Sequence, residues 1–168
     1  QHGAGTGAAS KMTLQPGLVV RALQASDLDA YKALRVHVMA QHEEAFTSDA
    51  ATEALRTAQS YAARLGSDTT RSFTLGAFHG DRLVGTVTCE HDARIKVQHI
   101  GHVTGMMVHA DEQGRGAGRA LIDALIERAS ADADLHQLTL NVTAGNQVAE
   151  RLYERSGFVR YGTLPRAI

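Results

Sequence analysis

The sequence predicts an α/β fold: a mixed, mostly antiparallel central sheet of about six strands with helices on both faces. Segments of alternating apolar and polar residues, typical of strands, interchange along the chain with segments that repeat apolar residues at helical spacing. The residues His79-Gly80-Asp81 separate two strand-like segments, which indicates an antiparallel hairpin. A later strand–helix–strand unit requires a parallel pair of strands. The predicted element order is therefore β-α-α-β-β-β-α-β-α-β.

The N-terminal half is expected to hold one strand and two helices. Residues 18–21, Leu-Val-Val-Arg, form a short strand. Ser26 or Asp27 can cap a helix that runs to about residue 40. A second helix is predicted from about residue 52 to residue 65, because its pattern stops near Gly66.

The middle of the chain is expected to form the antiparallel part of the sheet. Residues 72–78 and 82–90 are the strands of the hairpin. Residues 97–108 form a long strand that follows it.

The C-terminal part is expected to alternate between helices and strands. A helix over residues 116–130 repeats apolar side chains at i, i+4 spacing. A strand at residues 138–142 follows, and then a short helix over residues 148–154, which Asn146 can cap. The last strand is predicted to begin at Phe158 and to run to Tyr161.

Length and composition limit the classes of protein. The chain has 168 residues, of which 43% are hydrophobic and 21% charged, as in one ordinary globular domain. The formal net charge of −1 gives no general basic field, so we expect neither a nucleic-acid nor a membrane partner. The single cysteine, Cys89, excludes a disulfide within the chain and fits a reducing compartment, so we expect a cytoplasmic protein.

The first residues are expected to lie outside the domain. Residues 1–12 are small, polar and aperiodic, and we interpret them as a tag or a disordered tail. Gly3, Gly5 and Ala8 match a dinucleotide-binding pattern formally, but no strand can precede them. A single domain is expected over residues 17–168.

A glycine-rich loop is the clearest functional motif. The sequence Gln113-Gly-Arg-Gly-Ala-Gly118 follows a strand and opens a helix. Glycines there let backbone amides face a bound anion, and the helix N-terminus adds donors and the positive end of its dipole. The Lys of a Walker loop is absent, and the third small residue of a dinucleotide fingerprint is not at the right spacing. The motif alone is also compatible with a simple tight turn.

The surrounding sequence resembles the GNAT superfamily of acyl-CoA N-acyltransferases. Gln113-x-x-Gly116-x-Gly118 is similar to the Q/R-x-x-G-x-G/A signature of that superfamily, and Met106-Met107-Val108 precedes it on a strand. Farther along the chain, Asn146-x-x-Ala149-x-x-Leu152-Tyr153-Glu154-x-x-Gly157-Phe158 resembles the second family motif. The resemblance extends over about residues 18–168 and implies the GNAT fold, which usually closes with one more strand. The chain offers no residues for that strand, and an unpaired sheet edge favours a homodimer.

The resemblance implies acetyl-CoA as the co-substrate, with no metal. It implies that backbone amides of residues 113–119 bind the pyrophosphate and that the pantetheine arm pairs with the strand edge at residues 106–108. It also places Asn146 and Tyr153 at the coenzyme. The implied coenzyme-binding residues are Met106, Met107, Val108, Gln113, Gly114, Arg115, Gly116, Ala117, Gly118, Arg119, Asn146 and Tyr153.

Tyr153 and His102 are the leading candidates for catalysis. The resemblance gives Tyr153 the role of general acid near the sulfur, although an amphipathic core tyrosine is the alternative. His102 lies at the offset where histone-type members of the superfamily have a glutamate base. An imidazole can be a base near neutral pH, and a hydrogen-bonded strand histidine is the alternative. Glu90 is the second candidate for the base, and many members use only water and backbone carbonyls.

Other polar residues give weaker signals. Glu43, Glu44 and Asp49 lie where the family shapes the acceptor site. Acidic residues there would suit a cationic amine, and a solvated loop is the favoured alternative. His99 and His102 are at odd spacing and point to opposite faces of a strand, so with Cys89 and His91 they are not expected to bind a metal. A buried Cys89 is expected to be unreactive.

The resulting hypothesis is an N-acetyltransferase that moves an acetyl group from acetyl-CoA directly to a primary amine. The acceptor, a small molecule or a peptide, is not identified by the sequence. The alternative is a non-catalytic acyl-CoA-binding module with a sensing or regulatory role. Acetylation of aminoacyl-tRNA would require a basic surface, which the near-neutral charge argues against.

Overall fold

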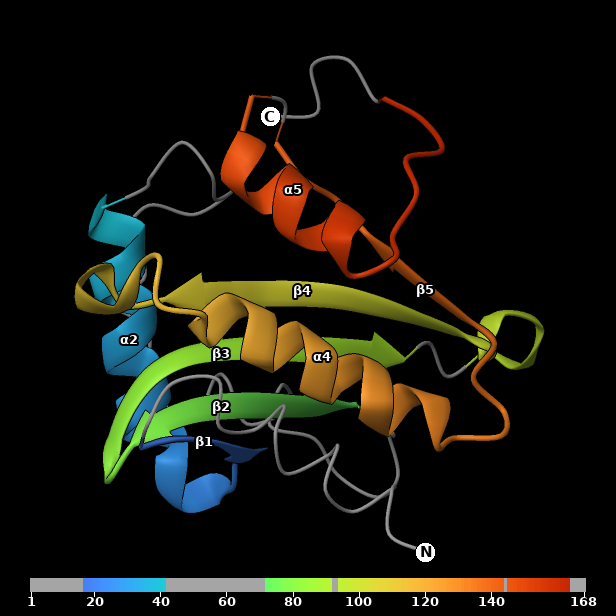
Figure 1. Cartoon of the computed structure of the whole chain (residues 1–168). Coiled ribbons are helices and arrows are strands. Elements are labelled where there is room, and N and C mark those ends of the chain that lie inside the picture. Colours follow the sequence, from blue (N-terminus) through green and yellow to red (C-terminus); the bar gives the residue numbers. More distant parts are fainter. Residues whose placement is uncertain (1–16, 42–71, 92–93, 144, 164–168) are drawn as a thin grey trace, which may run out of the picture.

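The computed structural model describes residues 17–41, 72–91, 94–143 and 145–163. One five-stranded sheet with the strand order β1-β2-β3-β4-β5 runs through them (Figure 1). The strands are β1 (Leu18–Ala22), β2 (Phe73–His79), β3 (Arg82–His91), β4 (Ile100–Val108) and β5 (Gln137–Leu140). The helices are α2 (Leu28–Gln41), α4 (Ala117–Ser130) and α5 (Gln147–Arg155).

The sheet is mixed, as the sequence predicts. Strands β1 to β4 pair antiparallel in chain order, and β5 pairs parallel with β4. The predicted helix over residues 52–65 lies outside the described residues. The long strand starts at Ile100, three residues later than predicted, because Ile95–Val97 form a short 3₁₀ helix before it.

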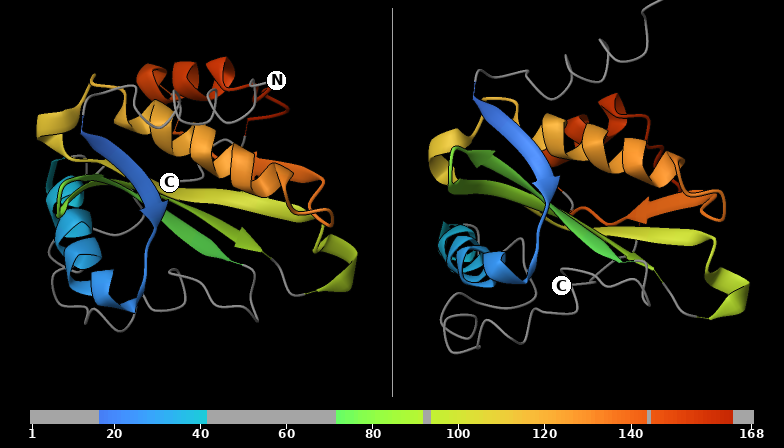
Figure 2. Two further views of the ribbon diagram at one scale, coloured as in Figure 1. Left: turned by 60° about the horizontal axis from the view of Figure 1, so that its bottom comes forward. Right: turned by 90° about the horizontal axis from the view of Figure 1, so that it is seen from below.

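Helices cover both faces of the sheet. Helix α2 lies on one face, and α4 and α5 lie on the other (Figure 2). On the α2 face, Tyr31, Leu34 and Val38 pack against apolar side chains of the sheet that include Met107. On the α4 face, Leu121, Ile122 and Leu125 are fully buried in the larger core cluster. The apolar repeat of residues 116–130 therefore marks the core-facing side of α4.

A bulge in β4 changes the side-chain alternation of that strand. Thr86 pairs with Met107 and Thr88 pairs with Thr104, so two residues of β4 oppose one residue of β3. Gly105 has a φ of +63°, which L side chains rarely adopt, and its carbonyl accepts a hydrogen bond from the Thr86 hydroxyl (3.1 Å). After the bulge, Met106 and Val108 pack on the α4 side, while Met107 packs on the α2 side.

The predicted strand at Phe158–Tyr161 is wrong, and the sheet has five strands where about six are predicted. Residues 158–163 have no regular secondary structure. Val159 is 84% exposed and Tyr161 is 86% exposed, so neither side chain packs on the sheet. β-branched and aromatic residues favour strands where a neighbouring strand is available, and this segment has none among the described residues.

Candidate active site

The edge of β4 that is not paired with β5 is the central feature of the site. The two strands pair from Ile100–Gln137 to Val103–Leu140. Beyond Val103, β4 continues to Val108, whereas β5 ends at Leu140. The edge of β4 over residues 104–108 is therefore not paired with β5. This part of the strand also holds the bulge and leads directly toward the glycine loop.

The glycine loop presents backbone amides that are not used within the helix. Ala120 donates the first backbone hydrogen bond of α4, to the Gly116 carbonyl (3.0 Å). The amides of residues 116–119 precede this bond and have no partner inside the helix. Gly114 (φ +75°) and Gly116 (φ +89°) both have open space where a Cβ would lie. The loop therefore exposes backbone donors at a helix N-terminus, where anions bind favourably.

Two side chains of the loop hold it in place. The Gln113 side-chain amide donates to the Val108 carbonyl at the end of β4 (3.1 Å). The buried Glu112 carboxylate lies 3.2 Å from His79 Nε2 on β2. The structure thus places Gln113 as an anchor of the loop, and its side chain faces the strand end. Ala117 is buried in the core, so only its backbone can meet a ligand.

Two arginines lie at the rim of the loop. Arg115 and Arg119 are exposed. Arg119 pairs with Asp123 one turn farther along α4 (3.1 Å). This pair offsets part of the Arg119 charge, whereas the described residues offer no ion pair to Arg115.

Helix α5 lies directly beside the start of α4. A Cβ on Gly118 would lie 3.3 Å from Leu152 of α5 and 3.9 Å from Val108 of β4. Gly118 therefore permits a close approach of three elements that the chain brings from separate regions. From the sequence, Gly118 is interpreted only as part of the glycine loop. Its role in packing against α5 is seen only in the structure.

Tyr153 projects from α5 into the α4-side core. It is 8% exposed, and its ring makes an edge contact with Phe158 (5.8 Å between centroids). Burial raises the pKa of Tyr153 to about 12, so the phenol is protonated throughout the neutral range. Asn146, in turn, caps α5 by accepting a hydrogen bond from the Ala149 amide (3.3 Å), as predicted.

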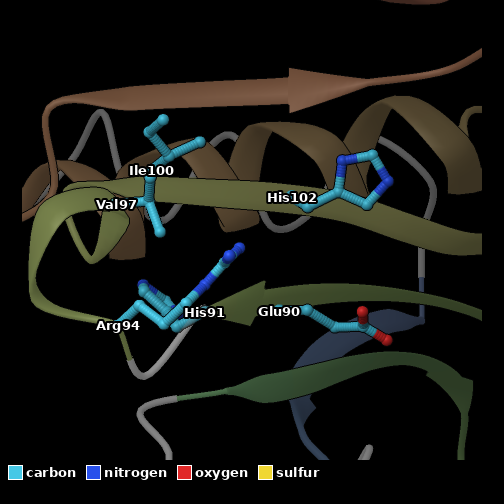
Figure 3. A pocket seen from close by; sticks show the side chains of 6 residues that line it. All are labelled: Glu90, His91, Arg94, Val97, Ile100 and His102. Atoms are coloured by element: carbon cyan, nitrogen blue, oxygen red, sulfur yellow. The ribbon is translucent and has the colours of Figure 1, made fainter.

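His102 lies on the opposite face of the sheet, in a row of polar side chains. It pairs with Glu90 of β3 on one side and with Thr139 of β5 on the other. His102 Nδ1 is 3.1 Å from Thr139 Oγ1. His102 and Glu90 also line a pocket of about 290 Å³ with His91, Arg94, Val97 and Ile100 (Figure 3). The structure thus brings both candidate bases together, and it adds Thr139 and Arg94, which the sequence analysis missed.

Among the described residues, Cys89 and His102 lie on opposite faces of the sheet and do not converge as metal ligands. Cys89 is fully buried in the α4-side core cluster, whereas the His102 side chain lines the pocket together with Glu90. No group of three or more potential metal-ligating side chains occurs within the described ranges. The acidic residues Glu43, Glu44 and Asp49 lie outside those ranges.

A stacked histidine pair supports the loop from the α2 side. The rings of His37 and His109 lie 3.8 Å apart and within 8° of parallel. His37 Nε2 accepts from the Ala110 amide (3.5 Å), and His109 Nδ1 accepts from the Asp111 amide (3.2 Å). Burial, the neighbouring His37 and Arg82 lower the pKa of His109, against the weaker opposite effects of Asp111 and Glu112. No sequence motif indicates this pair, because its members lie on separate elements.

We expect the free energy of unfolding to decrease in mild acid because of His109. The lowered pKa means that the unfolded chain binds this proton more readily, so stability is full above about pH 6.5 and decreases as the pH falls toward the folded-state pKa. Thermal unfolding between pH 5 and pH 8 measures this pH dependence of stability. The variant His109→Asn, which can keep an acceptor for the Asp111 amide, should lose part of the pH dependence. Exposed His136→Gln is the control, and equal profiles for both variants contradict the assignment.

Comparison with known protein families shows to which family the chain belongs. Residues 32–158, more than half of the chain, match the Acetyltransferase (GNAT) family. The chain belongs to this family of acyltransferase enzymes. The match confirms the resemblance that the sequence motifs indicate.

Individual relatives are similar over different lengths. The chain is 30% identical over 165 residues to mycothiol acetyltransferase from Geodermatophilus obscurus, covering 94% of this chain and 50% of that protein. It is 27% identical over 94 residues to N-alpha-acetyltransferase 30 from Schizosaccharomyces pombe, covering 56% and 62%. The chain thus spans between half and two thirds of these curated relatives.

A solved structure shares nearly the whole fold. The GNAT-family acetyltransferase from Streptococcus pneumoniae superposes with a TM-score of 0.79 and 27% identity, covering 90% of this chain and 89% of that one. Separately, no helix in the described part of the chain is long and apolar enough to cross a membrane.

Proposed function

We propose that this chain is an N-acetyltransferase that moves an acetyl group from acetyl-CoA directly to a primary amine. The observation that carries the proposal is the unpaired edge of β4, which leads into a loop of backbone amides with no partner inside the helix. The names of the relatives, mycothiol acetyltransferase and N-alpha-acetyltransferase 30, support an acetyl transfer.

The residues present fit the coenzyme. Open space at Gly114 and Gly116 leaves room for a diphosphate against the amides of residues 116–119, and the exposed Arg115 adds positive charge. The backbone of residues 106–108 would bind the amide-bearing arm as an added strand, with Asn146 near it. When bound, the coenzyme supplies an acetyl group on a thioester.

Tyr153 is proposed to donate a hydrogen to the departing sulfur. It belongs to the core cluster on the α4 side of the sheet and directly follows Leu152, which approaches Gly118 at the start of α4. Its pKa of about 12 keeps the phenol protonated. An ordinary thiol has a pKa of about 8.5, so the phenol stabilises the developing thiolate mainly by hydrogen bonding.

His102, on the face of the sheet opposite α4, is proposed to accept a proton from the amine. In the tautomer that carries the proton on Nδ1, Thr139 accepts this N–H and Nε2 keeps its lone pair. The amine nitrogen bonds to the acetyl carbon and the carbon–sulfur bond breaks. The nitrogen loses one proton to His102, and the sulfur leaves as a thiolate that accepts a hydrogen bond from Tyr153 and takes its proton from solvent. Glu90, directly across from His102, remains the second candidate for the base.

We expect Thr139→Val to lower kcat by roughly tenfold, about 1.4 kcal/mol of barrier, because the His102 ring loses the group that fixes its tautomer. Thr139→Ser keeps the hydroxyl and should retain most of the activity. The pH dependence of kcat should shift in the valine variant and not in the serine variant. Identical profiles in both variants contradict the role of Thr139 as a positioning residue.

The direct test of the function is product identification. The protein is incubated with acetyl-CoA and a set of primary amines, and the products are analysed by mass spectrometry for the gain of one acetyl group. Acetylated amine supports the transferase. Tight binding of coenzyme A with no acetylated product from any amine favours the non-catalytic acyl-CoA-binding module instead.

A further inference from the structure

The short turn that joins β4 to the glycine loop is held by three histidine side chains. Ala110–Glu112 form this 3₁₀ turn, which lies beside α2 (Figure 1). Its three residues contact, in chain order, His37 of α2, His109 at the end of β4 and His79 of β2. We propose that His109, stacked on His37, is a positioning residue for coenzyme binding, and that only its neutral ring holds the glycine loop in the binding geometry. The inference rests on the proposed function, in which this loop binds the diphosphate.

The turn determines where the loop lies, because backbone hydrogen bonds join the two. The Arg115 amide donates to the Glu112 carbonyl (3.3 Å), so the loop folds back onto the last residue of the turn. The backbone of His109 is fixed to the sheet, since its amide donates to the Val84 carbonyl of β3 (2.7 Å). A change in the turn is therefore passed to the loop, while the strand before it stays in place.

Two amides of the turn have histidine nitrogens as their acceptors. His109 Nδ1 accepts from the Asp111 amide at 3.2 Å. His37 Nε2 accepts from the Ala110 amide at the longer distance of 3.5 Å. An imidazole nitrogen accepts a hydrogen bond only while it carries no proton. The shorter contact makes His109 the stronger acceptor, and the parallel His37 ring, 3.8 Å away, fixes the plane in which it lies.

The surrounding charges favour the neutral ring of His109. An Arg82 guanidinium nitrogen of β3 lies 3.4 Å from its Nε2. Burial, His37 and Arg82 lower the pKa of His109 by more than Asp111 and Glu112 raise it. A second proton on the ring adds a positive charge beside Arg82 and removes the acceptor of the Asp111 amide. The protonated Nδ1 instead faces the exposed Asp111 carboxylate, 3.7 Å away, and this exchange of partners distorts the turn.

The third histidine responds to acid in the opposite direction. His79 Nε2 lies 3.2 Å from the buried Glu112 carboxylate, and their attraction increases when the imidazole is protonated. Acid therefore releases the start of the turn at Asp111 while its end stays held at β2. The turn is then free to rotate, and the Glu112 carbonyl that holds the loop rotates with it. We expect a local displacement of the loop and a weaker affinity for coenzyme A.

Calorimetric titration with coenzyme A between pH 8 and pH 5 tests the inference with two variants of His109. His109→Asn can keep an acceptor for the Asp111 amide but cannot be protonated. Toward pH 5, the Kd of the wild-type protein should increase about fivefold more than that of this variant. His109→Phe keeps a ring that can stack on His37 and has no acceptor, so it should bind about fivefold more weakly than the wild-type protein already at pH 8. Exposed His136→Gln should keep the wild-type pH profile.

The comparison between variants isolates the titration of His109. A phosphate monoester of the coenzyme also titrates near pH 6, but it affects every variant equally. Thermal unfolding at each pH selects the conditions in which all the proteins are folded, so that stability does not enter the Kd.

The outcomes separate this inference from the proposed function. An equal pH dependence of Kd in the wild-type protein and in His109→Asn overturns the inference and leaves the transferase in place. A wild-type affinity that rises in acid relative to the variant also overturns it, because the charge of His109 would then assist binding. No binding of coenzyme A by the wild-type protein at pH 8 contradicts the proposed function, and the inference with it.

Discussion

Replacing Gly116 by alanine is expected to weaken coenzyme A binding by at least tenfold. Gly116 is the N-cap residue immediately before α4 and has a φ of +89°, and the space where its Cβ would lie is open. The methyl group therefore meets no protein atom. It enters the space proposed for the diphosphate and forces an alanine into the left-handed region, at a cost of about 1–2 kcal/mol. Calorimetric titration with coenzyme A measures the loss.

A second glycine separates the two effects. Gly80, in the turn between β2 and β3, also has a positive φ (+58°) and open space around its Cβ position. Gly80→Ala should reduce the unfolding free energy by a similar amount, because the backbone strain is of the same kind. It should leave the Kd for coenzyme A unchanged. If the two variants lose affinity equally, the effect is one of stability, and the loop is not the diphosphate site.

Replacing Tyr153 by phenylalanine is expected to lower kcat by roughly a hundredfold, within the usual range for loss of a general acid. The ring that packs in the core and against Phe158 is kept, so stability and coenzyme affinity should change little. Only the hydroxyl that is proposed to serve the departing sulfur is lost. Steady-state kinetics with saturating acetyl-CoA measure the effect.

The matched control for this change is Tyr161→Phe, which removes a hydroxyl from an exposed tyrosine. That variant should have wild-type kinetics. Because burial raises the pKa of Tyr153 to about 12, the wild-type rate should show no loss from ionisation of this phenol below about pH 10. An unchanged kcat in Tyr153→Phe would leave the residue as a core tyrosine and remove it from the reaction.

Much of the architecture follows from local sequence patterns. The hairpin around Gly80, the long strand before the glycine loop and the core side of α4 depend on periodicity and turn residues, which act over a few positions. The segment that begins at Phe158 has the composition of a strand and forms none. Strand formation there depends on a paired neighbour, which a local pattern cannot supply.

The candidate active site is harder to predict from the sequence, because it depends on the register in which β4 and β5 pair. The sequence predicts the glycine loop and singles out His102 and Tyr153, but it does not show that Thr139 would meet the His102 ring. That contact requires the parallel register of β4 and β5, in which His102 is the partner of Thr139. The bulge at Gly105 also reverses which side chains face α2, and the sequence analysis does not include it. The stacking of His37 and His109 likewise depends on tertiary structure, because the two residues lie on separate elements.

The rate of thiol release from acetyl-CoA, followed from the first turnover with and without an amine, tests direct transfer most simply. The account predicts release that requires the amine and rises with its concentration, together with one acetylated amine for each thiol. A burst of thiol without amine would contradict direct transfer, because it would indicate an acetyl group held by the protein. Binding of the coenzyme with no release from any amine would contradict the enzyme itself.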